Sequence, residues 1–217
     1  MPRQASAEDV MRMLLALRQA GVRDQRVLAA MESVPRALFV DDPFADRAHE
    51  DTALPIACGQ TISQPSVVAR MTERLDVTDR CKVLEVGAGT GYQTAVLARL
   101  ARRVYGIERH RALVQAARAR LQALDIANVS LRTGDGTRGW PEQAPFDRIL
   151  VAAAADDVPG ILVDQLRLGG VMVLPVGLSD DVQTLIRVER TATGLDYQEF
   201  GDVLFVPLVE GLPEDGG

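Results

Sequence analysis

The sequence contains few of the side chains that build metal and redox centres. Its 217 residues include only two cysteines, Cys58 and Cys81, and two histidines, His49 and His110. The cysteines do not form a C-x-x-C pair, and structural metal sites usually draw on such groups of cysteine and histidine. We therefore expect no metal site, and we expect both thiols to behave as small apolar side chains.

The sequence also lacks an excess of positive charge and a long apolar run. Lys and Arg total 24 against 30 for Asp and Glu, a formal net charge of −6, which gives no general attraction for phosphate backbones or anionic lipid. No apolar stretch approaches the ~18 residues of a membrane-spanning helix. Glu8 and Asp9 interrupt the region where a signal peptide would be most apolar. The sequence thus predicts a cytoplasmic protein without nucleic-acid or membrane partners.

Composition and length predict one folded domain. Hydrophobic residues make up 47% of the chain and charged residues 25%, which is ordinary for a globular protein. A chain of 217 residues fits one core with an elaborated terminus. We expect a single domain over residues 1–217, with a helical cap at 1–79 and the main α/β core at 80–217.

Helical spacing of apolar residues predicts the helical cap. One helix is expected between a capping signal at Ser6 and a stop at Gly21. Its apolar positions are Val10, Met13, Leu14 and Leu17. A second helix should follow Asp24, and a third should begin at Pro65 after a loop-like stretch from residue 54 to 64.

From Cys81 onwards, short apolar strands alternate with helices. We expect strands in KVLEVG, RVYGIE, VSLRTG, FDRILVAAA and VMVLPVG, and helices at about 92–101, 111–124 and 161–168. Parallel neighbours need a crossover helix, so this alternation predicts a Rossmann-like, mostly parallel sheet. Two later stretches, VQTLIRVER and DVLFVPLVE, are expected to add an antiparallel pair at its edge.

The sharpest motif is a glycine-rich loop between the first strand and the following helix. Gly87, Gly89 and Gly91 lie there, and Glu108 ends the next strand 21 positions after Gly87. Glycines let the backbone turn tightly beside a ligand, and an acidic residue about 20 positions on can accept hydrogen bonds from a ribose diol. The alternative is that Glu108 is only a solvated strand end and the glycines only a turn.

The details of the loop favour S-adenosylmethionine over NAD. The spacing is G-x-G-x-G, with Tyr92 where the G-x-G-x-x-G loop of a dinucleotide fold has its third glycine, and Glu85 stands just before the loop. A carboxylate there repels a pyrophosphate but suits an ammonium and a sulfonium. Asp135, after the third strand, should lie at the same sheet edge near an adenine ring, or it is a simple Asp-Gly turn; the residues leave both open.

Residues 54–65, LPIACGQTISQP, end at the start of a helix. Free N–H groups there, the hydroxyls of Thr61 and Ser63 and the amides of Gln60 and Gln64 would suit an anion such as a carboxylate. The alternative, which the residues alone favour, is that Thr61 and Ser63 only cap the helix.

Several motifs together resemble the protein-L-isoaspartate O-methyltransferase family. They are VPRALFVDDPF, GQTISQP, VLEVGAGTGYQTAVLA, GDG, APFDRILV, LPVG and FVPLVEG, and the resemblance runs from Leu14 to Gly211. It implies a seven-stranded methyltransferase sheet with an antiparallel terminal strand. It also implies methylation by S-adenosylmethionine of the free α-carboxylate of L-isoaspartyl residues in damaged proteins, which starts repair through a succinimide.

The same resemblance assigns roles to residues. Ser63 becomes the catalytic candidate, and the cofactor is expected to contact Thr61, Ile62, Ser63, Glu85, Gly87, Ala88, Gly89, Glu108, Asp135 and Gly136. Cys58 stands where the family leads us to expect glycine or another small residue. Ser66 and the stretch at 153–156 also depart from its pattern, around the expected substrate mouth.

Other functions remain open at this point. The chain could be a peptide-tailoring, RNA or small-molecule carboxylate methyltransferase of the same fold, or a non-catalytic S-adenosylmethionine-binding module. We expect isoaspartyl proteins and peptides as substrates and a monomeric enzyme.

Overall fold

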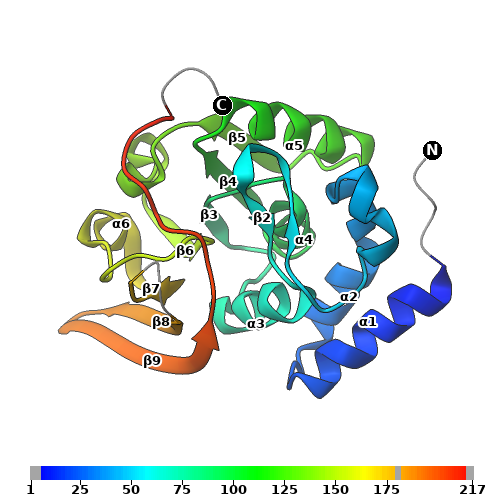
Figure 1. The fold of residues 1–217 in the computed structure, drawn as a ribbon. Coiled ribbons are helices and arrows are strands. Elements are labelled where there is room, and N and C mark those ends of the chain that lie inside the picture. Colours follow the sequence, from blue (N-terminus) through cyan, green and yellow to red (C-terminus); the bar gives the residue numbers. More distant parts are fainter. Residues whose placement is uncertain (1–5, 179–181, 214–217) are drawn as a thin grey trace.

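A computed structural model describes residues 6–178 and 182–213 and begins with a group of helices (Figure 1). Helix α1 (Ala7–Gln19) starts at a capping box made by Ser6 and Asp9, and α2 (Gln25–Ser33) starts at Asp24. Helix α3 (Pro65–Leu75) begins at a proline. All three were predicted, because their start signals and apolar spacing are local.

Short segments connect α2 to α3. Three turns of 3-10 helix, η1 (Arg36–Phe39), η2 (Asp42–Arg47) and η3 (Ala57–Gly59), lie between them. Strands β1 (Leu54–Pro55) and β2 (Thr61–Ile62) pair as a small antiparallel hairpin. This hairpin carries Thr61 and Ile62 and leads directly to Ser63.

The main sheet has seven strands in the order β5-β4-β3-β6-β7-β8-β9. The neighbours from β5 to β7 pair in parallel, and β8 is antiparallel to both β7 and β9. The strands are β3 (Lys82–Val86), β4 (Arg103–Glu108), β5 (Val129–Thr133), β6 (Phe146–Val151), β7 (Leu166–Val176), β8 (Gln183–Thr191) and β9 (Gly194–Val203). The predicted mixed, mostly parallel sheet is confirmed.

Helices connect the parallel strands. They are α4 (Tyr92–Leu100), α5 (Arg111–Ala123) and α6 (Gly160–Asp164), with short 3-10 turns η4 (Gly136–Arg138) and η5 (Pro141–Gln143). After β3 the chain adds β4 and β5 on one side of it and then adds β6 and β7 on the other side. The strand order therefore reverses at β3, which leaves a crevice at the carboxyl end of this strand. Open α/β sheets bind ligands at such a switch point.

Two predicted elements are corrected by the structure. The helix expected over 161–168 ends at Asp164, and β7 starts at Leu166. The Arg190 guanidinium donates to the carbonyls of Val163, Asp164 and Leu166, so a distant strand satisfies the groups that end this helix. The last strand is Gly194–Val203, whereas most of the predicted strand DVLFVPLVE is extended chain beyond it.

The helical cap and the sheet share apolar packing. Leu17, Met31 and Phe39 belong to one buried cluster with Tyr92 of α4 and Leu113 of α5. Burial of apolar surface between the cap and the core stabilises their mutual arrangement. This packing supports the proposal that residues 1–217 act as one domain.

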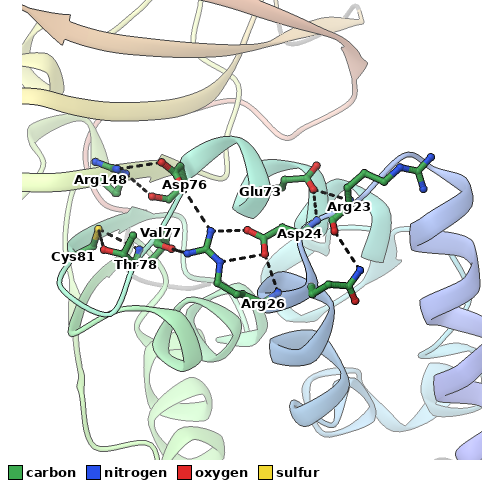
Figure 2. A network of polar contacts seen from close by, with 10 residues as sticks. Arg23, Asp24, Arg26, Glu73, Asp76, Val77, Thr78, Cys81 and Arg148 are labelled. Atoms are coloured by element: carbon green, nitrogen blue, oxygen red, sulfur yellow. Dashed lines mark hydrogen bonds and ion pairs between the residues drawn. The ribbon is translucent and has the colours of Figure 1, made fainter.

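Polar contacts add to this connection (Figure 2). Glu73 of α3 accepts hydrogen bonds from the backbone N–H groups of Arg23 and Asp24, both at 2.7 Å. Arg26 pairs with Asp24 at 2.7 Å and lies 3.7 Å from Asp76. Arg148 of β6 donates to the Asp76 carbonyl at 3.0 Å, so α2, α3 and the sheet meet in one network.

Two features are absent from the described parts of the chain. None of the helices there is both long and apolar enough to cross a membrane. Over the same residues, no three His, Cys, Asp or Glu side chains gather in a way that could hold a metal ion.

Candidate active site

The glycine-rich loop connects β3 to α4 and bonds to the end of β4. Gly87, Gly89 and Gly91 have φ of 84°, 53° and 91°, a region that side chains with a Cβ rarely adopt. The N–H groups of Gly87 and Ala88 donate to the Ile107 carbonyl at 2.8 and 3.1 Å. A Cβ on Gly87 would lie 3.3 Å from the Ala152 carbonyl oxygen, so the loop has little room for a side chain.

Glu108 is part of this loop's structure and not a solvated strand end. Glu108 is only 6% exposed. One carboxylate oxygen accepts from the N–H of Gly89 and the other from the N–H of His110, both at 2.9 Å. The carboxylate therefore fixes the loop and also faces the cavity beside it.

Glu85 lies behind the loop. It is fully buried, and its Oε2 accepts a hydrogen bond from Thr94 at 2.5 Å. Burial raises the pKa of Glu85 to about 8, with the nearby Glu108 charge adding and the Thr94 bond opposing. At neutral pH the Glu85 carboxyl group is therefore mostly protonated and uncharged. It can attract a cation, as the sequence predicts, only if the bound cation lowers the pKa of Glu85.

Asp135 and Gly136 follow β5. One Asp135 oxygen accepts from the Thr137 N–H at 2.9 Å, and the other accepts from the Gly211 N–H at 3.0 Å. Burial alone would raise the pKa of Asp135, but a hydrogen bond from the Thr137 hydroxyl, the two backbone bonds and Arg138 outweigh it and keep the pKa below its ordinary value. A Cβ on Gly136 would lie 2.5 Å from Val86 Cγ1, so this backbone packs closely against β3.

Two neighbouring cavities lie at the carboxyl edge of the sheet, and the glycine loop borders both. The first is lined by Ile56, Gln60, Thr61, Val86, Gly87, Gly89, Ile107, Glu108, Arg109, Gly136, Ala152, Ala153 and 206–209. The second is lined by Thr61, Ile62, Ser63, Val68, Met71, Gly87, Ala88, Gly89, Thr90, Tyr92, Gln93, Ala152 and Phe205. Hairpin strand β2 and the loop after β3 thus form walls of the same space.

The structure brings most of the predicted site residues to these walls. Thr61, Gly87 and Gly89 border both cavities, Glu108 and Gly136 border the first, and Ile62, Ser63 and Ala88 border the second. Glu85 and Asp135 lie behind the walls, where they hold neighbouring residues, and their contact with a cofactor stays a prediction.

The alternative that Thr61 and Ser63 cap α3 is wrong. Gln64 is the N-cap residue of this helix, and it makes no side-chain capping bond. Asp51 takes that role instead, because its Oδ1 accepts from the Ser66 N–H at 2.7 Å. Ser63 instead lines the second cavity.

Sequence patterns did not reveal the segment after β9 as part of the site. Residues 206–209 line the first cavity, and in Figure 1 this chain runs past β6. The Ala154 N–H donates to the Val206 carbonyl at 2.8 Å, and the Leu208 N–H donates to the Ala154 carbonyl at 2.7 Å. The apolar residues of FVPLVEG predict a strand. Only the backbone bonds to Ala154 show where this segment lies.

Cys58, the first departure from the family pattern, has a backbone conformation that suits glycine. Its backbone has φ of 61° within η3, the left-handed region that glycine adopts most easily. A glycine would relieve strain there, and cysteine accepts it at some cost in stability. Ser66, the second departure, is buried, and its hydroxyl accepts from the Gln64 amide at 2.9 Å.

Comparisons with known proteins point to one family. The protein-L-isoaspartate(D-aspartate) O-methyltransferase family matches residues 8–212. A protein-L-isoaspartate O-methyltransferase from Ruegeria pomeroyi is 62% identical over 209 residues, which are 96% of this chain and 97% of that protein. One of the same name from Dinoroseobacter shibae is 60% identical, over 97% of this chain and 98% of that protein.

Solved structures agree on the fold. A structure named protein-L-isoaspartate O-methyltransferase has 27% sequence identity and a TM-score of 0.82, over 91% of this chain and 65% of that one. Another, from Plasmodium falciparum in complex with S-adenosyl-L-homocysteine, has 27% identity and a TM-score of 0.80, over 92% of this chain and 98% of that one. The chain belongs to the protein-L-isoaspartate(D-aspartate) O-methyltransferase family.

Proposed function

We propose that Ser63 orients the isoaspartyl carboxylate in this chain, and that Thr61, Ile62 and the glycine loop hold the methyl donor beside it. The observation that carries this proposal is the second cavity. Ser63 and Gly87–Gly89 both border it, although they come from separate segments of the chain. The chain is a protein-L-isoaspartate O-methyltransferase and depends on S-adenosylmethionine. The proposal therefore assigns parts of a known reaction to named residues.

Positioning is the main task of the chain's residues. A free carboxyl group ordinarily has a pKa of about 3.5 to 4 and is ionised at neutral pH, so it needs no strong general base. S-adenosylmethionine supplies the methyl group that this carboxylate accepts. Ser63 contributes a hydroxyl donor, which can fix one carboxylate oxygen while the other stays free to react.

Ser63 is an orienting residue in this proposal and not a nucleophile. A serine nucleophile needs an adjacent base that removes its proton. In residues 6–178 and 182–213, no hydrogen bond links the Ser63 hydroxyl to a histidine or lysine. The geometry favours a hydroxyl that donates.

The residues around the first cavity fit the methyl donor. The positive φ angles of Gly87 and Gly89 and the close contacts of Gly87 and Gly136 leave a cradle that side chains would fill. Glu108 faces the same space with a carboxylate, which can accept from a ribose diol. We propose that Glu108 holds the ribose and that Gly136 lies near the adenine.

A turnover assay tests the role of Ser63. The substrates are methyl-labelled S-adenosylmethionine and an isoaspartyl peptide, with the same peptide carrying normal aspartate as the negative control. We expect Ser63→Ala to lower kcat by about 10- to 100-fold, because a misplaced reacting group can cost this much. The Kd for S-adenosylhomocysteine should stay within about twofold, since Ser63 is not expected to hold the cofactor's charged groups.

A second serine variant serves as the control. Ser33 ends α2, its hydroxyl donates to the Ala30 carbonyl and it borders neither cavity, so Ser33→Ala should leave kcat unchanged. If Ser63→Ala lowers turnover and cofactor affinity equally, Ser63 is not the orienting residue.

The same assay separates the alternative functions. A peptide-tailoring relative would methylate one partner peptide and ignore an unrelated isoaspartyl peptide, and a binding module would transfer no label. The cytoplasmic location stays a prediction of the sequence. The monomeric state likewise stays a prediction of the sequence, and light scattering tests it.

A further inference from the structure

Arg36 is a fully buried arginine whose contacts lead to Ser63. It lies in η1, between α2 and the hairpin, and its exposed fraction is 0%. Its Nε donates to the Ala48 carbonyl and its Nη2 donates to the Ser63 carbonyl, both at 2.8 Å. A planar guanidinium can hold two such acceptors in fixed directions, which an ammonium cannot do.

The third contact of Arg36 is with a wall of the cavity. Its guanidinium carbon lies 4.8 Å from the centre of the Tyr92 ring, and Tyr92 borders the same cavity as Ser63. Tyr92 is itself 2% exposed. Arg36 therefore joins Ser63 to the first residue of α4, directly after the glycine loop.

Burying a cation in this way is costly unless something compensates for it. Within the described residues, Arg36 donates to carbonyl oxygens and not to a carboxylate, and its Nη1 is buried without a hydrogen-bond partner. Burial lowers the pKa of Arg36, while Tyr92 and Asp51 oppose this effect. Because arginine stays protonated in proteins, a positive charge remains behind Ser63.

The connection between α2 and the hairpin also contacts the start of α3 at a second point. Asp51 accepts from the Ser66 N–H at 2.7 Å, one turn away from the Arg36 contact. The two contacts, at Ser63 and Ser66, bracket Gln64 and Pro65, and both come from the connection between α2 and the hairpin. Residues 36–51 thus clamp the start of α3 from outside the sheet.

We propose that Arg36 is a positioning residue that fixes Ser63 and whose buried charge favours a carboxylate in the cavity that Ser63 borders. The inference rests on the proposed role of Ser63. It gives residues 36–51 a function in catalysis, namely to hold the start of α3 against the glycine loop.

Two substitutions of Arg36 separate its positioning role from its charge. Arg36→Lys keeps a positive charge but loses the fork that reaches Ala48 and Ser63 together. We expect it to lower kcat by about 10- to 100-fold, with a nearly unchanged Kd for an isoaspartyl peptide in the presence of S-adenosylhomocysteine. Arg36→Met loses the charge as well, so it should lower kcat and also weaken peptide binding at least about tenfold. Neither change should alter the Kd for S-adenosylhomocysteine by more than about twofold.

Arg148 provides a matched control for the loss of a buried arginine. It is 8% exposed, and it donates to the Asp76 carbonyl in the network of Figure 2, which has no part in either cavity. Arg148→Lys and Arg148→Met should lower the melting temperature while kcat stays near that of the wild type. If Arg36→Lys and Arg148→Lys lower kcat equally, or if Arg36→Lys leaves kcat unchanged, the proposal is wrong. This lysine pair decides the matter even if Arg36→Met does not fold.

A double variant distinguishes failure of this inference from failure of the proposed site. If Arg36 acts through the Ser63 hydroxyl, Arg36→Lys should lower kcat by no more than about twofold in a Ser63→Ala background. A fully additive loss would contradict positioning through Ser63. If Ser63→Ala alone is fully active, the role of Ser63 fails, and the peptide affinity of Arg36→Met then tests the role of the buried charge by itself.

Discussion

At the scale of single residues, three carboxylates near the glycine loop have different tasks. Glu108 holds two backbone N–H groups and faces a cavity. Asp135 fastens the end of the chain through Gly211. Glu85 is buried behind the loop with one oxygen bonded to Thr94 and the other without a partner in the described residues. Their surroundings, and not their residue type, set their roles.

Glu85 predicts a pH dependence of stability. Its pKa is raised from 4.5 to about 8, so between these pH values the folded chain holds a proton that the unfolded chain releases. The free energy of unfolding should therefore fall as pH rises through this window. Glu85→Gln removes this titration, so the variant should gain stability relative to the wild type from pH 5 to pH 8. Urea unfolding at several pH values measures the difference, and a difference that does not change with pH would contradict the assignment.

Glu108 predicts a loss of cofactor affinity. Glu108→Gln puts an amide donor against the N–H of Gly89 or His110 and removes a charged acceptor from the first cavity. Hydrogen bonds to charged groups contribute about 1.5 to 3 kcal/mol, so we expect the Kd for S-adenosylhomocysteine to rise about 10- to 100-fold. Calorimetric titration measures it. An unchanged Kd would mean that Glu108 serves only the loop.

At the scale of elements, the start of α4 depends on one glycine. Gly91 has φ of 91°, and a Cβ there would lie 3.0 Å from Ala117 Cβ of α5. Gly91→Ala should therefore cost more than the roughly 1–2 kcal/mol of a left-handed alanine. Gly169→Ala is the control, because Gly169 has φ of 72° and nothing within 4 Å of its Cβ position. Chemical denaturation measures the free energy of unfolding of both variants. Equal losses of this free energy would show that the contact with Ala117 adds nothing to the cost of Gly91→Ala.

Local signals predicted the elements that carry the glycine loop, and long-range contacts decided the rest. The strand, loop and helix around Gly87 follow from apolar spacing and glycine positions within a few residues, and Glu108 follows from its distance along the chain. The end of α6 does not, because Arg190 of β8 satisfies its carbonyls. The link from Arg36 to Ser63 spans 27 residues and has no local pattern.

At the scale of the whole molecule, three separate parts of the chain enclose the site. The hairpin before α3, the glycine loop and residues 206–209 line the first cavity, whose volume is about 70 Å³. Ligand pockets usually have about 300 to 1,000 Å³, so we predict that the walls separate to admit a nucleoside and then pack against it. Residues 206–209 lie outside the seven-stranded sheet and bond to Ala154 through two backbone hydrogen bonds, so we expect this segment to take part in the movement.

Hydrogen exchange tests this closure. The N–H groups of Leu208 and Gly211 bond to Ala154 and Asp135 across the site. We expect both amides to exchange at least about tenfold more slowly with S-adenosylhomocysteine bound, because the bound ligand packs against residues 206–209 and suppresses further opening of the segment. The Val104 amide, which bonds to the Asn128 carbonyl near the start of β4 and borders neither cavity, is the internal control. Equal exchange with and without ligand would show that the segment does not respond to the cofactor.

The most direct measurement is a crystal structure of this chain with S-adenosylhomocysteine and an isoaspartyl peptide. Our account predicts the ribose at Glu108, the sulfur between the glycine loop and β2, and the peptide carboxylate within hydrogen-bond distance of the Ser63 hydroxyl. A cofactor bound away from Gly87–Gly89, or a carboxylate held by other side chains with Ser63 remote from it, would contradict the account.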